Sequence, residues 1–89
     1  MDPAELADRY FTHVYDRTCD MHRATFVSFV VGRPYLAAYL WRLDSPQAPE
    51  VPERAVTAAH RDLAWFQREM NAAIADADST SWRARCRTL

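Results

Sequence analysis

Hydrophobic residues recur every three or four positions along this 89-residue chain, which is the spacing of one face of an α-helix. The clearest run lies in the last third of the chain, where arginine and acidic side chains cover most of the intervening positions. Its apolar members are Val56, Ala59, Leu63, Phe66, Met70, Ala73 and Ala77. Pro52 suits the start of such a helix, so we predict a long amphipathic helix over 53–77.

A second helical pattern begins at the N-terminus. Asp2 is a helix-capping residue type, and Pro3 suits the first helical position. Apolar residues then repeat at four-residue intervals: Leu6, Tyr10 and Val14. The stretch 24–31 is apolar on nearly every side, and we expect it to form the buried centre of the fold. Its β-branched and aromatic residues would also allow a strand, but the sequence offers no partner strand, so we predict one helix over 3–31.

Glycine and proline mark the breaks between helices. Gly32 is the only glycine in the chain, so the tight turns of β-hairpins have almost no place to form. Gly32 suits the end of one helix, and Pro34 suits the first turn of the next. We predict a short helix over 34–43, a proline-rich loop over 44–52 and a basic tail over 79–89.

The fold class that follows is all-α. We expect a single helical domain over residues 1–89, built as a small three-helix array, with a short fourth helix at the C-terminus as an open alternative. Apolar residues make up 49% of the chain and charged residues 26%, as in folded globular proteins. A helical array of this length has a small core, so a protein partner or a second copy of the chain would add to its stability.

The charge distribution argues against nucleic acid as a partner. The formal net charge is −1, all twelve acidic residues precede residue 79, and residues 79–89 carry three arginines without an acid. An acidic body with a short basic tail differs from the broad basic surface of nucleic-acid-binding proteins. The sequence also shows no apolar run of membrane-spanning length and no signal peptide before the first helix. We therefore expect a cytoplasmic protein without a membrane partner.

Histidine, aspartate and cysteine side chains raise the question of a metal site. His13, Asp16 and Asp20 share one side of the first predicted helix, with Cys19 and His22 on an adjacent side. This spacing completes no ligand set, and two cysteines form neither a disulfide framework nor a zinc motif. The chain also lacks a nucleophile elbow and a phosphate-binding loop. We expect no metal, no cofactor and no enzymatic activity; a metal- or haem-binding bundle and a small enzyme subunit are the alternatives.

Aromatic residues are more numerous than a small core can bury, and they indicate a binding surface. Tyrosine, tryptophan and arginine are the residue types that dominate protein interfaces. The predicted partner-binding residues lie in the 34–43 helix and in the tail: Tyr35, Tyr39, Trp41, Trp82, Arg83, Arg85 and Arg87. We therefore predict a protein that acts by contact with another protein, and a homodimer is a further option.

Taken as a whole, the chain resembles the CowN family, small proteins of nitrogen-fixing bacteria that sustain nitrogenase when carbon monoxide is present. The resemblance lies in Asp8-Arg9-Tyr10, Cys19-Asp20, the aromatic segment 35–42, Ala59-His60 with the helix around it, and Cys86 near the C-terminus. The arginines of the tail depart from the family's acidic tail. The resemblance implies a non-enzymatic protective protein whose partner is nitrogenase. A small helical inhibitor or adaptor of phage or toxin–antitoxin type is the alternative.

Overall fold

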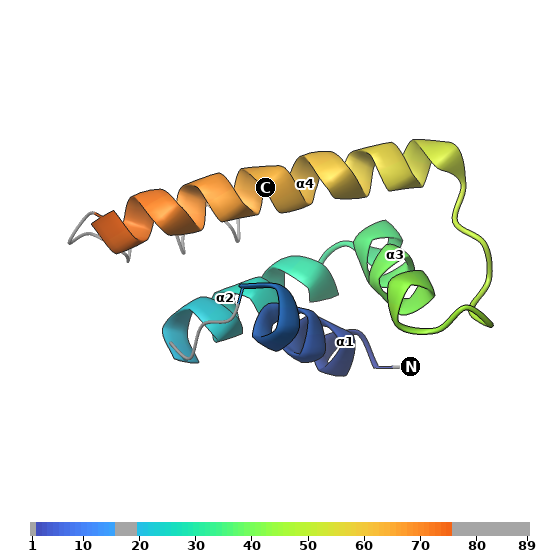
Figure 1. The fold of residues 1–89 in the computed structure, drawn as a ribbon, viewed down its shortest axis with the longest axis horizontal. Coiled ribbons are helices and arrows are strands. Elements are labelled where there is room, and N and C mark those ends of the chain that lie inside the picture. Colours follow the sequence, from blue (N-terminus) through green and yellow to red (C-terminus); the bar gives the residue numbers. More distant parts are fainter. Residues whose placement is uncertain (1, 16–19, 76–89) are drawn as a thin grey trace.

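The computed structural model describes residues 2–15 and 20–75, and this part of the chain is built from helices and contains no strand (Figure 1). The elements are α1 (Pro3–Tyr10), a π-helical segment η1 (Phe11–Tyr15), α2 (Asp20–Val31), α3 (Pro34–Asp44) and α4 (Glu53–Ala75). The all-α fold class is therefore confirmed. The short fourth helix considered for the C-terminus and the tail over 79–89 lie outside the described residues.

Helix α1 begins where the sequence predicts. The side chain of Asp2 accepts a hydrogen bond from the N–H of Ala4 at 3.1 Å, and Pro3 opens the helix. This bond satisfies one of the amide groups that the first helical turn leaves without a partner. Glu5 lies in the same turn, where a negative charge interacts favourably with the helix dipole.

The segment 3–31 differs from the single helix that the sequence predicts. Helices α1 and α2 are separate elements that pack against one another (Figure 1). The physical reason is burial of two aromatic rings. Phe11 and Phe26 are fully buried, with ring centroids 6.0 Å apart, whereas one continuous helix would separate them by about 22 Å. Packing the two halves together removes both rings from water.

Arg42 holds the proline-rich connection between α3 and α4. Its guanidinium donates to the carbonyl oxygens of Pro46 and Ala48, the latter at 3.1 Å. Ala48 itself is buried. Helix α3 ends at Asp44, one residue beyond the prediction, and α4 begins at Glu53 as predicted. The loop is therefore both stiffened by prolines and tied to the helix that precedes it.

Helix α4 supplies one side of the core and runs above α2 and α3 in Figure 1. The apolar stripe predicted for it is buried at Ala59, Leu63, Phe66, Met70 and Ala73. At its centre, the ring of Phe66 lies 4.9 Å from that of Phe26, nearly edge to face. Such aromatic pairs add about 0.5–1.5 kcal/mol beyond the area that they bury.

Four apolar residues expected on the buried stripes lie instead at the surface: Val14, Ala24, Val31 and Leu43. Tyr10 of α1 stacks on Phe26 of α2. In η1, the two rings of Phe11 and Tyr15 also form aromatic contacts with Phe26. Because these two large rings fill the space against α2, Val14 is turned away from the core and is 55% exposed. This displacement creates the surface described next.

Gly32 follows the last residue of α2, as predicted. Its N–H donates to the carbonyl of Ser28 at 3.2 Å, and the N–H of Arg33 donates to that of Val30 at 2.9 Å. Its backbone does not adopt the left-handed conformation expected of a glycine helix terminus. An added Cβ would come no closer than 3.6 Å to the Ser28 oxygen, so the fold places no steric demand for glycine here.

Candidate partner-binding surface

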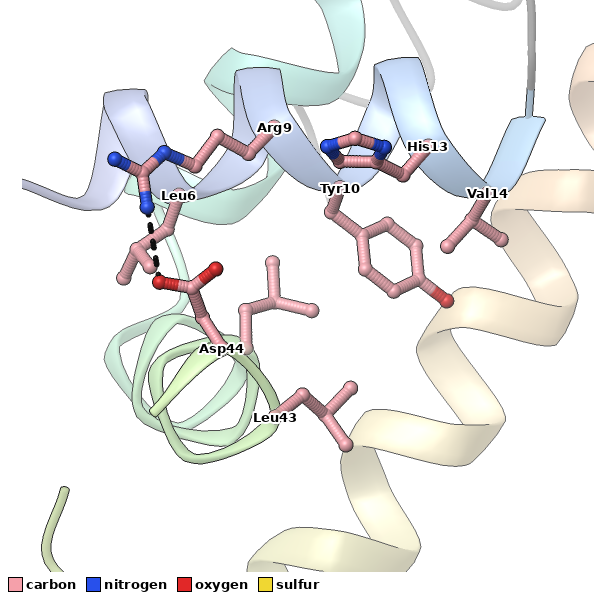
Figure 2. Close-up of a pocket in the computed structure, with 8 residues that line it drawn as sticks. Leu6, Arg9, Tyr10, His13, Val14, Leu43 and Asp44 are labelled. Atoms are coloured by element: carbon pink, nitrogen blue, oxygen red, sulfur yellow. Dashed lines mark hydrogen bonds and ion pairs between the residues drawn. The ribbon is translucent and has the colours of Figure 1, made fainter. Parts of the chain in front are cut away.

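A groove separates α1 and η1 from α3, and two exposed aliphatic side chains lie along its rim (Figure 2). Val14 of η1 and Leu43 of α3 are 55% and 56% exposed, and both line this hollow of about 200 Å³. The buried side chains of Leu6 and Leu40 form its base. The groove is therefore an apolar concave surface with two aliphatic residues at its rim.

This convergence sets the groove apart from ordinary surface hydrophobicity. Single exposed aliphatic residues are common on soluble proteins and need no explanation. Val31, at 53% exposure, is of that kind. Val14 and Leu43 differ because they come from distant parts of the chain and border the same hollow. Fully burying an exposed side chain of this kind contributes about 1.5–3 kcal/mol, and roughly half of this is available to a partner because each residue is already about half covered.

One end of the groove is closed by an ion pair. Arg9 Nη1 lies 3.0 Å from Asp44 Oδ2, which connects α1 to α3 (Figure 2). The other terminal nitrogen of Arg9 lies 3.3 Å from Glu5. Exposed pairs of this kind contribute about 0–1 kcal/mol to stability. Their main effect here is to give the apolar groove a polar rim, which is typical of protein interfaces.

Tyr10 extends the groove toward α4 (Figure 2). Burial raises the pKa of its phenol, and the nearby hydroxyl of Tyr39 raises it further. A hydrogen bond of 2.7 Å joins the hydroxyl of Tyr39 to Nε2 of His60, with the two rings edge to face at 5.2 Å. Tyr10 of α1 thus lines the groove, and the neighbouring Tyr39 of α3 is bonded to α4.

A second hollow of about 610 Å³ lies where the start of α3 meets α4, and its charge is positive. Its lining includes Arg33, Arg61 and Arg68 but a single carboxylate, that of Asp62. The guanidinium of Arg33 lies 3.8 Å from the ring centroid of Phe29, a favourable cation–π geometry. This hollow therefore combines guanidinium groups with an aromatic base.

The structure separates the predicted partner-binding residues. Tyr35 and Tyr39 are half-buried and hydrogen-bonded to Asp62 and His60 of α4, so they belong to the α3–α4 contact. Trp41 is half-buried and packs against the core. Trp82, Arg83, Arg85 and Arg87 lie outside the described residues.

Sequence analysis missed both hollows. Val14 and Leu43 carry no sequence signal as a pair, because they come to line one hollow only through the packing of α1 against α3. Arg61 and Arg68 did carry a signal: they are seven residues apart on the best-defined helix. From the sequence alone, we expected these arginines only to form part of the polar, solvent-exposed face of the helix.

The described residues offer no metal centre. No three His, Cys, Asp or Glu side chains within 2–15 and 20–75 come together in a way that would hold an ion. His13 is exposed at the groove, and His22 is buried in α2. Asp16 and Cys19 lie outside the described residues. None of the described helices is both long and apolar enough to cross a membrane.

Comparisons with known proteins leave the family open. No family model matches the chain, and neither the curated proteins nor the solved structures yield a match. The resemblance to the CowN family therefore stays a prediction. Function has to be argued from the surface itself.

Proposed function

We propose that this chain acts without catalysis, as a small helical protein that binds another protein through the groove between α1, η1 and α3. The observation that carries this proposal is that two exposed aliphatic residues, Val14 and Leu43, line one hollow with an apolar base. An aliphatic side chain of the partner, placed in the groove, would bury both residues. The proposal includes a cytoplasmic location, where such a partner would be encountered.

The character of the groove favours a protein over a small molecule. Small-molecule sites usually combine an apolar wall with a few polar groups that fix the orientation of the ligand. Here the charged groups at the rim, Arg9 and Asp44, are bonded to one another. An apolar centre within a polar, partly hydrated rim is instead the arrangement of protein interfaces.

Three exposed aliphatic residues allow a matched test. Val14→Ser and Leu43→Ser remove the apolar rim of the groove, and Val31→Ser makes the same kind of change on an equally exposed residue of α2. Partners recovered with each variant after chemical crosslinking in cells are compared with those of the wild type. We expect one partner to be lost with Val14→Ser and Leu43→Ser and retained with Val31→Ser. Equal recovery with all three variants would contradict the proposal.

The CowN resemblance makes nitrogenase the first partner to test. The expected role is protection, so substrate reduction by nitrogenase under carbon monoxide should persist when the protein is added in several-fold molar excess. Leu43→Ser should reduce the protection, and Val31→Ser should not. No protection by the wild type would exclude nitrogenase as the partner. We would then propose that the same groove serves an inhibitor or adaptor that binds another protein.

A second copy of the chain is the competing occupant of the groove. In that case the purified protein would sediment as a dimer, and Leu43→Ser would dissociate it. A monomer in solution, together with a partner that depends on the groove, supports the heterologous contact proposed here.

A further inference from the structure

Helix α4 carries a row of arginines on the side turned away from the core. Arg54, Arg61 and Arg68 are seven residues apart and all are exposed. Positions two residues apart on a helix point to opposite sides. Arg61 is two residues before the buried Leu63, and Arg68 is two residues after the buried Phe66. The arginine row, defined as Arg54, Arg61 and Arg68, therefore runs opposite the buried stripe.

Two adjoining hollows lie along this row. The one of about 610 Å³ includes Arg61, Arg68 and the half-buried indole of Trp65. The other, of about 540 Å³, includes Arg54 and Arg61 and is shaped by the small residues Thr57 and Ala58. Both include Arg61, so the two hollows adjoin along α4, the larger one at its contact with α2 and α3 and the smaller one on α4 itself. Small side chains between the arginines allow the backbone of a partner to approach closely.

The positive charge of this surface is only partly compensated. The carboxylate of Asp62 is shared by Arg33 Nε at 4.0 Å and Arg61 Nε at 3.8 Å, and it also accepts from the hydroxyl of Tyr35. One negative charge thus serves two guanidinium groups. The N-cap position of α3 is occupied by Arg33 without a side-chain capping bond, so the positive end of that helix dipole adds to the potential.

The outer two arginines of the row are free to bind an anion. Neither Arg54 nor Arg68 forms an ion pair with any residue in the described part of the chain. Glu53 borders the hollow of about 540 Å³ but is not paired with Arg54. Guanidinium groups bind carboxylates through two parallel hydrogen bonds. The row therefore offers carboxylate-binding groups at regular intervals.

We infer that the arginine row binds an acidic α-helical segment of the partner protein, with carboxylates seven residues apart on one face. This inference rests on the proposed function and names the chemistry of the partner. Residues seven apart on α4 are separated by about 10.5 Å along the axis. An acidic helix repeats at the same distance, and helices that cross at a small angle keep this register. On an extended strand, same-face residues recur at about 6.6 or 13 Å, which fits the row poorly.

The test uses synthetic peptides, so it does not depend on knowing the partner. The probe is a capped, alanine-rich 21-residue peptide with three glutamates seven residues apart. One control replaces these glutamates with glutamine, and another spaces them five residues apart, which places them on different faces. Affinity is measured by isothermal titration calorimetry with the full chain. The arginine Nε–Hε resonances in NMR spectra locate the contact.

We expect the seven-residue peptide to bind at least about tenfold more tightly than either control, with shifts confined to Arg54, Arg61 and Arg68. The double variant Arg61→Gln with Arg68→Gln should weaken binding about tenfold, whereas Arg9→Gln, at the groove, should leave it unchanged. Equal binding of the three peptides, or undiminished binding by the double variant, would overturn the inference. Tighter binding of a single-stranded oligonucleotide at the same arginines would also overturn it. Loss of the partner with Leu43→Ser tests the groove separately, so either idea can fail alone.

Discussion

The hydroxyl of Tyr35, at the second residue of α3, donates a hydrogen bond to the carboxylate of Asp62 in the middle of α4. Asp62 also faces the guanidinium of Arg33, whose side chain is only 12% exposed. This contact fixes the start of α3 against α4. It also positions the carboxylate that Arg33 and Arg61 share beside the arginine row.

Tyr35→Phe should lower the free energy of unfolding by about 1–2 kcal/mol, because a bond to a charged acceptor is lost. The matched control is Tyr39→Phe, which removes a bond to the exposed His60 and should cost less. Urea unfolding of the three proteins at pH 7 measures both effects. Equal stability of the wild type and Tyr35→Phe would show that the bond contributes nothing.

Because of the phenol of Tyr35, we also expect the stability of the fold to fall at alkaline pH. Burial, followed by the hydrogen bond to Asp62, raises the pKa of Tyr35 above its usual 10. Its stabilising effect is therefore fully present below pH 10 and is lost as pH rises through the higher, folded-state pKa. Tyr35→Phe should show a smaller loss of stability between pH 9 and 11 than the wild type. An identical loss in both proteins would assign the alkaline effect to other groups.

The core prediction concerns α4. Phe66 is fully buried and Leu63 is 9% exposed, so Phe66→Ala should destabilise by about 3–5 kcal/mol and Leu63→Ala by about 2–5 kcal/mol. Gln67→Ala, at an exposed position of the same helix, should change stability by less than about 0.5 kcal/mol. Thermal and urea unfolding measure these values. An unchanged melting temperature for both core variants would mean that α4 does not pack on α2 as described.

Tyr15→Phe should not lower the free energy of unfolding, in contrast to the core variants of α4. The hydroxyl of Tyr15 is buried without a hydrogen-bond partner among the described residues, and burial raises the pKa of this phenol. Removing an unsatisfied buried hydroxyl should leave stability unchanged or raise it by about 1 kcal/mol. A loss of more than about 1 kcal/mol in urea unfolding would show that the hydroxyl has a partner in the part of the chain not described.

We expect the arginines of the basic tail to affect the rate of association with the partner. If Arg83, Arg85 and Arg87 attract the partner from solution, changing all three to glutamate should slow association and weaken its dependence on salt, with little change in dissociation. Leu43→Ser should instead speed dissociation, because it removes a buried contact. Surface plasmon resonance with the identified partner separates the two rates. Unchanged association for the tail variant at low salt would exclude steering by these arginines.

The helices could be predicted where a single local signal dominates. The spacing of Leu63, Phe66 and Met70 identified α4, and Pro34 marked the start of α3. The division of residues 3–31 into helices that pack against one another could not be predicted, because the stretch is apolar enough to continue one helix. The energy that favours two helices comes from burying Phe11 against Phe26, which is a contact between distant residues.

The candidate site was less accessible to prediction than the fold. Tyr35 and Tyr39 have the composition of interface residues, yet their hydroxyls are bonded to α4. Val14 and Leu43 were expected on buried stripes, and only the packing of α1 against α3 brings them to one groove. Sequence periodicity reports which face of a helix is apolar. It does not report which end of that face another helix covers.

The central claim, that the groove binds a protein partner, is tested most directly by a photocrosslinking residue placed at position 43. Benzoylphenylalanine in place of Leu43 lies at the rim of the groove, and the same residue in place of Val31 is the control on an equally exposed position. After irradiation of cells, we predict one dominant adduct from position 43 that is absent from position 31. The same adducts from both positions, or none from position 43, would contradict the account.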